Sequence, residues 1–259
     1  MRKTIDEKIS HTPPLFIQRL WMGFLFSGYV VYSFFVFSKA ERIKKTKGKR
    51  EWQQYVRPKV RRFCQRCFVW LGMKPQIRHM ERLPDTGAYL LIANHQSFFD
   101  ISLVLGFLSP NAFLMAKKEF SKLPFFGRAV SQVGYFIDRK DPKQAIASLR
   151  KAIEHLKEGT PFALFPEGTR SVDGKMGPFQ KNSLKLAYIA KVPIIPVVIE
   201  GTQYVMPKGS FFALRAQVKA EVLEAVHPED HPDEEQLSRF LHSEMQAKKK
   251  EMENEKSNH

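Results

Sequence analysis

The chain has 259 residues, 43% of them hydrophobic, which allows one sizeable domain with a real core, with or without an appendage. Its formal net charge is +16, but residues 39–66 alone hold twelve Lys or Arg against two Glu. From Glu229 onward the sign reverses, with nine acids against five bases. The basicity is therefore a local patch, and a surface that is basic throughout is excluded.

The first predicted element is an apolar helix over residues 20–38, nineteen residues without a formal charge. As a helix it is ~28 Å long, close to the hydrocarbon thickness of a bilayer. A cleavable signal peptide fits poorly, because the stretch is too long and no small-residue cleavage site follows it. The segment is therefore expected to span a bilayer or to lie in one leaflet. The alternative is a buried helix of a soluble protein, which Gly23, Gly28 and several serines favour because they weaken the hydropathy.

A dense basic patch follows this segment directly. Its first residues are Lys39, Arg42, Lys44, Lys45, Lys47, Lys49 and Arg50. If the apolar helix spans, the positive-inside rule places everything after residue 39 in the cytoplasm. If the helix lies in one leaflet, anionic headgroups attract the patch. Nucleic-acid binding is the rival explanation of the patch, but no recognisable nucleic-acid motif accompanies it.

Residues 40–72 are predicted to form a charged helical connector. Cys64 and Cys67 form an isolated C-x-x-C within it. Zinc would need two further ligands, and a redox motif would need a thioredoxin-like context. We therefore expect two reduced thiols on an amphipathic helix.

From about residue 77, short apolar strands alternate with helical stretches. The expected strands are Ile77–Met80, Tyr89–Ala93, Ala112–Ala116, Tyr135–Ile137, Phe162–Phe165, Ile194–Ile199 and Ala216–Leu223. An amphipathic helix is predicted over 142–157, with Pro142 in its first turn and Gly159 at its end. Further helices are expected over 182–190 and 233–252. This alternation predicts an α/β fold with a largely parallel central sheet flanked by helices.

Three regions are expected along the chain. Residues 1–72 form an N-terminal segment with the membrane-associated helix and the basic connector. Residues 73–228 form the α/β domain, and residues 229–259 form a polar C-terminal helix and tail.

His95 and Asp100 lie five residues apart, directly after an apolar run over 88–93. A histidine titrates near neutral pH, and a carboxylate beside it can fix its tautomer and stabilise the imidazolium. On an uninterrupted helix a five-residue step separates two side chains by roughly 140°, so these two meet only if a turn intervenes. Ser97 can supply that turn as a helix N-cap. The alternative is a capping box in which Asp100 serves only the helix start.

Three further segments place polar side chains after apolar runs. Phe165–Ser171 offers a glycine for close backbone approach, with Thr and Arg donors suited to phosphate. Gly134–Arg139 ends in an arginine, and Ala116–Phe120 holds a pair of lysines. Each has an ordinary explanation: a strand-to-loop turn, an ion pair with Asp138, or a surface turn. Their joint occurrence, in order and each after an apolar run, favours a binding site.

With these segments the chain resembles the 1-acylglycerol-3-phosphate acyltransferases (PlsC-type) of the lysophospholipid acyltransferase superfamily. That family carries four ordered blocks, and the resemblance covers about residues 75–225. The blocks are N-H-x4-D at 94–100, G-x-x-I-D-R at 134–139, F-P-E-G-T-R-S at 165–171 and V-P-I-x-P-V at 192–197. One departure is Asn182, where the family often has glycine. Asparagine also tolerates the left-handed backbone, so the turn is expected to survive.

The resemblance implies acyl transfer from an acyl thioester to the sn-2 hydroxyl of 1-acyl-sn-glycerol-3-phosphate, giving phosphatidic acid. It implies His95 as the general base and Asp100 as the carboxylate that holds it, without a covalent intermediate, cofactor or metal. Arginines and a lysine are expected to clamp the phosphate, and loop backbone donors to face the oxyanion. The implied substrate-binding residues are Lys117, Arg139, Glu167, Gly168, Thr169 and Arg170, with Glu167 as an organiser of its loop.

The implied partners are lysophosphatidate, acyl-CoA or acyl carrier protein as co-substrate, and a membrane surface with anionic lipids, but no nucleic acid. The implied location is a bacterial cytoplasmic membrane, with the catalytic domain on the cytoplasmic side. Two alternatives stay open. One is the same chemistry on another lyso-lipid, such as another lysophospholipid or a lyso-ornithine lipid. The other is a non-catalytic basic protein that binds membranes or nucleic acid.

Overall fold

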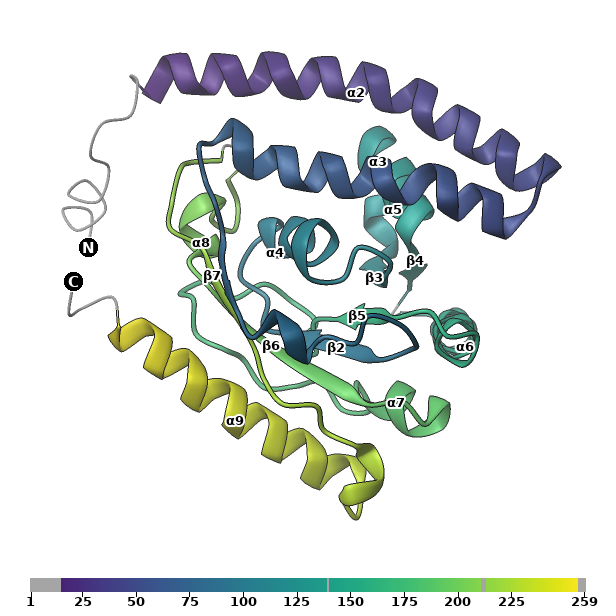
Figure 1. The fold of residues 1–259 in the computed structure, drawn as a ribbon, viewed down its shortest axis with the longest axis vertical. Coiled ribbons are helices and arrows are strands. Elements are labelled where there is room, and N and C mark those ends of the chain that lie inside the picture. The colour runs from purple at the N-terminus through teal and green to yellow at the C-terminus, as the bar shows by residue number, and fades with distance from the viewer. Residues whose placement is uncertain (1–14, 139, 211–212, 256–259) are drawn as a thin grey trace.

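The computed structural model describes residues 15–138, 140–210 and 213–255 (Figure 1). Within these ranges seven strands form one sheet in the order β1-β7-β6-β2-β5-β3-β4. The strands are β1 (Gln76–Arg78), β2 (Leu90–Ala93), β3 (Phe113–Lys117), β4 (Gly134–Ile137), β5 (Phe162–Leu164), β6 (Ile194–Glu200) and β7 (Lys219–Val222). Neighbouring strands are parallel except β6 and β7, which are antiparallel. The predicted α/β fold with a largely parallel sheet is confirmed.

Helices cover both faces of this sheet. They are α2 (Leu15–Thr46), α3 (Lys49–Trp70), α4 (Phe99–Leu103), α5 (Pro124–Val133), α6 (Pro142–Lys157), α7 (Lys185–Ala190), α8 (Thr202–Val205) and α9 (Glu234–Asn254). A π-helical turn, η2 (Val104–Leu108), extends α4, and short 3-10 turns are η1 (Met80–Arg82), η3 (Lys118–Lys122) and η4 (Pro228–Asp230). Figure 1 shows α3, α4 and α5 on one side of the sheet, α6, α7 and α9 on the other, and α2 outside α3.

Each face of the sheet has its own apolar core. Leu91 and Ala93 of β2 pack into the core with α3 and α4, whereas Leu90 and Ile92 pack into the core with α6 and α9. Successive side chains of a strand point to opposite faces, so a central strand covered on both sides is apolar at every position. The C-terminal helix α9 contributes Leu237 to the second core. It is therefore packed against the sheet.

Several elements match their predicted ranges, and the differences have local causes. Helix α6 coincides with the prediction, and the Asp141 side chain caps it by accepting the Gln144 N–H at 3.1 Å. The first strand ends at Arg78, not Met80, because His79 turns into the left-handed region with φ 57°. Helix α7 begins at Lys185, three residues later than expected. Asn182 precedes it with φ 62°, so the expected left-handed turn is present.

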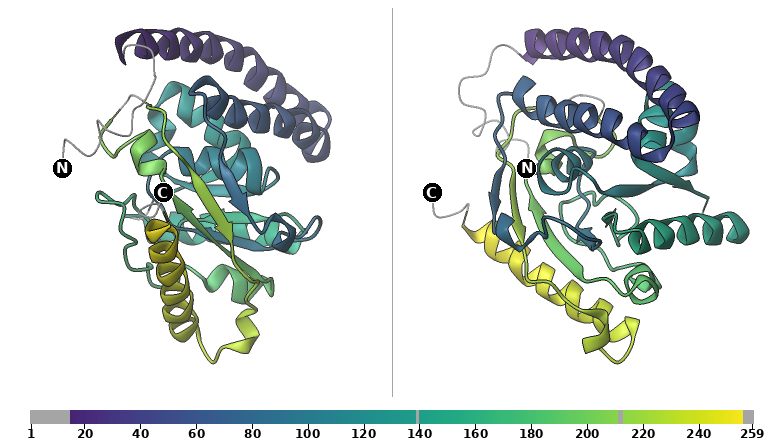
Figure 2. Two further views of the ribbon diagram at one scale, coloured as in Figure 1. Left: turned by 60° about the vertical axis from the view of Figure 1, so that its left-hand side comes forward. Right: turned by 45° about the vertical axis from the view of Figure 1, so that its right-hand side comes forward.

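The connector differs from the prediction. It is not one helical stretch over 40–72, because α2 continues to Thr46 and the chain then reverses at Gly48 (φ 97°). That backbone region favours glycine. Helix α3 runs back alongside α2, as both views of Figure 2 show, and the Tyr29 and Phe63 rings stack with centroids 4.0 Å apart. Cys64 and Cys67 of α3 are free thiols, as expected.

Helix α2 is long and apolar enough over Gly23–Thr46 to cross a membrane, by length and composition. Its outer surface carries several large apolar side chains with more than half of their area exposed. They are Phe24, Val31, Phe34 and Phe35. Its inner surface, including Val36 and Phe37, is buried. The helix therefore has one face for the protein and one apolar face turned outward.

Candidate active site

His95 and Asp100 are in direct contact. The His95 Nδ1 atom lies 2.8 Å from the Asp100 Oδ2 atom, with the aspartate side chain fully buried and the histidine side chain 15% exposed. Strand β2 ends two residues before His95, so a rigid strand at the carboxyl edge of the sheet holds the imidazole. With Nδ1 on the carboxylate, Nε2 is the ring nitrogen left to accept a substrate proton.

Asp100 also organises the start of α4. Its Oδ2 atom accepts the backbone N–H groups of Gln96 at 2.6 Å and Ser97 at 2.8 Å. The Ser97 hydroxyl in turn accepts the Phe99 N–H at 3.3 Å. Only one half of a capping box is therefore present, because the Ser97 hydroxyl does not accept the Asp100 N–H and α4 has Phe98 at its N-cap without a side-chain cap. The dyad is present, but the expected N-cap at Ser97 is not, since Phe98 takes that position. A backbone turn closed by the Asp100 N–H on the Ser97 carbonyl brings Asp100 back to His95.

The F-P-E-G-T-R-S segment lies alongside this histidine, because β5 pairs with β2. The Phe165 ring stacks on the His95 imidazole with centroids 4.2 Å apart and planes 17° apart. The Ser171 N–H donates to the His95 carbonyl at 2.8 Å, and the His95 N–H donates to the Glu167 carboxylate at 2.7 Å. The ring plane and the backbone of His95 are therefore fixed by one segment.

Glu167 clamps two loops together. Its second carboxylate oxygen accepts the Gly177 N–H at 2.7 Å, and its side chain is buried. Burial raises the pKa of Glu167 above its ordinary value, although the two backbone donors act in the opposite direction. Both oxygens face backbone amides, a geometry that organises the loop.

The backbone N–H of Gly168 is already used in a hydrogen bond within its own loop. Gly168 has φ 68° and its N–H donates to the Phe165 carbonyl at 3.0 Å, so this amide closes the turn. The neighbouring Thr169 is exposed.

Arg170 places a cation next to the dyad segment. Its guanidinium lies over the Phe98 ring at 4.0 Å, and its Nη1 atom is buried without a hydrogen-bond partner in the described structure. Burial lowers the pKa of Arg170, which the Asp100 charge partly offsets. A buried donor without a partner has unused capacity for an anionic ligand.

The other predicted cations lie elsewhere or are not described. Lys117 ends β3, two strands away from β2, and its side chain is exposed. None of the hydrogen bonds or ion pairs found among the described residues joins it to the dyad. Arg139 lies outside the described residues. Asp138 before it pairs with Lys118, whose Nζ atom is 3.1 Å from its carboxylate.

Two residues of the site were given no role by the sequence analysis, although Asn94 begins the N-H-x4-D block. The Asn94 side chain donates to the Ile199 carbonyl at 2.9 Å and accepts the Ile199 N–H at 2.7 Å, which ties the end of β2 to β6. The Thr202 hydroxyl donates to the Asp100 carboxylate. One signal was available for Thr202. Residues 200–202 repeat the Glu-Gly-Thr of 167–169, each after a strand and each with glycine at positive φ.

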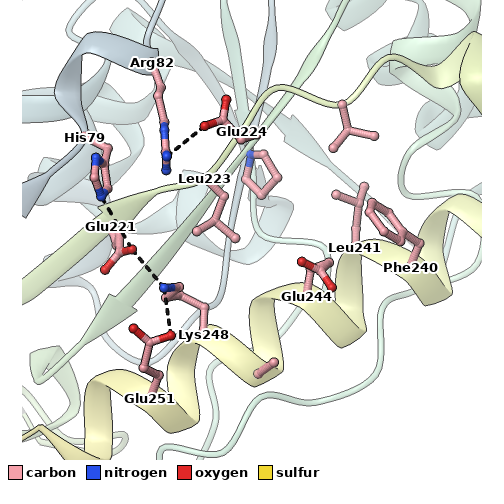
Figure 3. A pocket seen from close by; sticks show the side chains of 13 residues that line it. His79, Arg82, Glu221, Leu223, Glu224, Phe240, Leu241, Glu244, Lys248 and Glu251 are labelled. Atoms are coloured by element: carbon pink, nitrogen blue, oxygen red, sulfur yellow. Dashed lines mark ion pairs between the residues drawn. The ribbon is translucent and has the colours of Figure 1, made fainter.

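A cavity of about 450 Å³ lies away from the dyad, between β7 and α9 (Figure 3). Its lining includes His79, Arg82, Glu221, Glu224, Phe240, Lys248 and Glu251. Most of its charged groups are paired, with Lys248 bridging Glu221 at 3.2 Å and Glu251 at 2.8 Å. None of the predicted site residues lines it. In the part of the chain that the structure describes, no three His, Cys, Asp or Glu side chains gather as a metal site.

Comparisons with known proteins place this geometry in a family. The acyltransferase family model matches residues 74–200. A 1-acyl-sn-glycerol-3-phosphate acyltransferase of Pseudomonas aeruginosa is 32% identical over 177 residues, covering 66% of this chain and 67% of that protein. A chloroplastic 1-acyl-sn-glycerol-3-phosphate acyltransferase of Brassica napus is 36% identical over 139 residues, covering 53% of this chain and 40% of its own length.

A crystal structure shares the fold as well. The 1-acyl-sn-glycerophosphate acyltransferase PlsC of Thermotoga maritima superposes with a TM-score of 0.79 at 32% identity, over 92% of this chain and 95% of that one. The sheet, the His–Asp dyad and these similarities are those of the acyltransferase family. The chain belongs to the acyltransferase family. It spans about two fifths of the length of the Brassica napus relative.

Proposed function

We propose that the protein transfers an acyl group from an acyl thioester to the sn-2 hydroxyl of 1-acyl-sn-glycerol-3-phosphate, giving phosphatidic acid. The observation that carries this proposal is the 2.8 Å contact between His95 and Asp100, next to the segment that ends in the partly unpaired guanidinium of Arg170. Relatives named for this reaction support the choice of acceptor.

The residues suit proton abstraction. The His95 Nε2 atom takes the proton of the acceptor hydroxyl as its oxygen attacks the thioester carbonyl, and Asp100 stabilises the imidazolium that forms. The tetrahedral intermediate then collapses with cleavage of the C–S bond. The thiol leaves with the proton that the imidazolium returns, so the products are an ester and a free thiol.

The phosphate of the acceptor is assigned to Arg170, because a guanidinium binds phosphate oxygens in a bidentate manner. Arg139 and Lys117 are proposed as further phosphate contacts. The donor is proposed to be acyl-CoA or acyl carrier protein, with no cofactor and no metal.

We propose that α2, which is long and apolar enough to cross a membrane, associates the protein with a membrane by lying in one leaflet. Val36, Phe37 and Ala40 of this helix are buried against the domain, and Tyr29 stacks on Phe63 of the arginine-rich α3. A helix crossing the bilayer over 20–38 would have to lose these contacts or pull α3 into the hydrocarbon. The basic residues after the apolar segment favour a leaflet rich in anionic lipid, and we propose the cytoplasmic face of a bacterial inner membrane.

The test offers the purified protein, in mixed micelles, lysophosphatidate and other lyso acceptors, each with acyl-CoA and with acyl carrier protein donors. We expect lysophosphatidate to be the best acceptor. His95→Ala should lower turnover by ~10²–10⁴-fold while the melting temperature is kept. His227→Ala is the matched control, since the His227 side chain is 51% exposed and belongs to another part of the molecule.

Near-full turnover in His95→Ala would overturn the role of the dyad. A preference for a different lyso-lipid would keep the chemistry and replace the acceptor. Binding of lipid without any transacylation in the wild-type protein would overturn the proposed activity.

A further inference from the structure

Thr202 holds the side of Asp100 that faces away from the histidine. The Asp100 Oδ2 atom accepts Gln96 and Ser97 N–H groups and faces His95 Nδ1, whereas the Oδ1 atom accepts the Thr202 hydroxyl. Asp100 and Thr202 are both completely buried. Water therefore does not replace the hydroxyl at this oxygen, and an unsatisfied buried carboxylate oxygen is costly.

A tight turn brings Thr202 to this position. Strand β6 ends at Glu200, and Gly201 turns the chain with φ 98°. A Cβ atom at Gly201 would lie 2.0 Å from the Gln217 carbonyl oxygen, so both the backbone angle and the space require glycine. Thr202 then begins α8 with its side chain directed at Asp100. The turn at Gly201 therefore determines where the Thr202 hydroxyl lies.

The hydroxyl proton has two acceptors within reach. The Thr202 Oγ1 atom contacts the Asp100 carboxylate and lies 3.2 Å from the Gln96 Oε1 atom. The hydroxyl has one proton, and a charged acceptor makes the stronger bond. The amide orientation of Gln96 is set independently, because its Nε2 atom faces two acceptors, the Gly174 carbonyl at 3.2 Å and the Glu200 carboxylate at 3.4 Å. The Thr202 hydroxyl therefore donates its hydrogen bond to the Asp100 carboxylate.

A buried ion pair holds Glu200, whose carboxylate faces the Gln96 amide. The Lys249 Nζ atom of α9 lies 2.7 Å from the Glu200 Oε2 atom, and both side chains are less than 5% exposed. Burial alone would lower the pKa of Lys249, but the charges and hydrogen bonds of Glu200 and Glu253 raise it overall. The pair fixes Glu200, which fixes the Gln96 amide next to Thr202.

We infer that Thr202 is a positioning residue of the acyl-transfer dyad. Its hydroxyl fixes the rotation of the Asp100 carboxylate so that Oδ2 stays on His95 Nδ1. The terminal torsion of Asp100 is an sp³–sp² torsion with no narrow intrinsic minimum, so it is set by hydrogen bonds, those of Oδ2 on one side and that of Thr202 to Oδ1 on the other. This inference rests on the proposed function, because it concerns the dyad that performs the transfer.

The experiment compares three substitutions at this position under the micelle assay with lysophosphatidate and acyl-CoA. Thr202→Val keeps the shape and loses the hydroxyl, Thr202→Ser keeps the hydroxyl and loses the methyl, and Thr202→Ala loses both. We expect kcat to fall roughly 10- to 100-fold for Val and Ala. Ser should retain kcat within about threefold, and KM for both substrates should change less than about twofold in all three.

The matched control is Tyr89→Phe. The Tyr89 hydroxyl is a buried hydrogen-bonding group, 2.8 Å from the Ser109 hydroxyl, at the opposite end of β2 from His95. Its loss should lower the melting temperature about as much as Thr202→Val does, without lowering kcat.

The outcomes separate the two levels of inference. A Val variant with wild-type kcat, or a Ser variant as slow as Ala, would overturn the positioning role while the transfer activity of the wild type stands. An equal loss of kcat in Tyr89→Phe would reduce the effect to general stability and also overturn it. Should Thr202→Val fail to fold, the comparison of Ser with Ala decides alone. A wild-type protein without transacylation would instead overturn the proposed function.

Discussion

Glu167 places a buried negative charge next to the dyad without touching either of its side chains. Each carboxylate oxygen accepts one backbone N–H, from His95 at 2.7 Å and from Gly177 at 2.7 Å. An amide of the same shape has one acceptor and one donor group. A glutamine at position 167 therefore cannot accept both backbone N–H groups.

We predict that Glu167→Gln costs both stability and activity. Its NH₂ group must face one of the two backbone donors, so the free energy of unfolding should fall by about 1–3 kcal/mol. Transfer should slow roughly tenfold through the His95 backbone, a loss of about 1.4 kcal/mol of transition-state stabilisation. Urea denaturation and initial rates measure the two effects. The control is Glu158→Gln on the surface, where the side chain is 56% exposed, and an unchanged Glu167→Gln would contradict the clamp.

At this scale the sequence predicted the contacts that are local. His95, Ser97 and Asp100 fall within six positions, so a single local turn was enough to predict that the histidine and the aspartate could meet. Thr202 lies 102 residues from Asp100. Its approach depends on the pairing of β6 with β2 and on the turn at Gly201, neither of which spacing specifies.

Helix α2 is the element whose position matters most for access to lipid. Its outward face exposes Phe24, Val31, Phe34 and Phe35, while its inner face packs on the protein. We predict that an alkaline carbonate wash releases the protein from membranes, because an interfacial helix is not threaded through the bilayer.

A substitution on this face tests the same arrangement quantitatively. The Phe35 side chain is 66% exposed, and burying a phenylalanine in lipid contributes about 2 kcal/mol, so Phe35→Glu should weaken vesicle binding more than tenfold. Ile146→Glu on α6, at a position 51% exposed, is the matched control and should leave vesicle binding unchanged. Retention of the wild-type protein after the wash would favour a spanning helix.

Among the elements, the sequence predicted those with strong periodicity and clear ends. Helix α6 is one, since apolar residues recur every three to four positions between Pro142 and Gly159. The reversal at Gly48 was missed because a single glycine in a charged helical stretch does not specify a hairpin. The order of the strands could not be predicted either, because no local pattern in the sequence indicates that β6 pairs with β7.

Over the whole molecule, stability should depend on pH through a histidine far from the dyad. His155 of α6 lies against the Phe113 ring with centroids 4.1 Å apart, and its Nδ1 atom is buried without a hydrogen-bond partner in the described structure. Burial, aided by the charge of Lys49, lowers the pKa of His155 from 6.5 to about 4. The folded state therefore resists a proton that the unfolded state accepts.

The sign follows from that difference. Above pH 6.5 both states are neutral at His155, and between 6.5 and about 4 only the unfolded state gains the proton, so the free energy of unfolding falls as pH drops. The contribution is at most roughly 3 kcal/mol. His155→Phe should reduce the acid-induced loss of stability in urea denaturation, whereas His227→Ala should leave it unchanged. An equal pH dependence in His155→Phe and the wild type would contradict this assignment.

The double use of Asp100 has a consequence for the folding of the site. The same carboxylate oxygen that accepts the Gln96 and Ser97 amides at the start of α4 also orients the imidazole. The start of α4 and the orientation of the imidazole therefore form together. A chain in which the start of α4 is frayed would therefore also lose the contact that orients the imidazole.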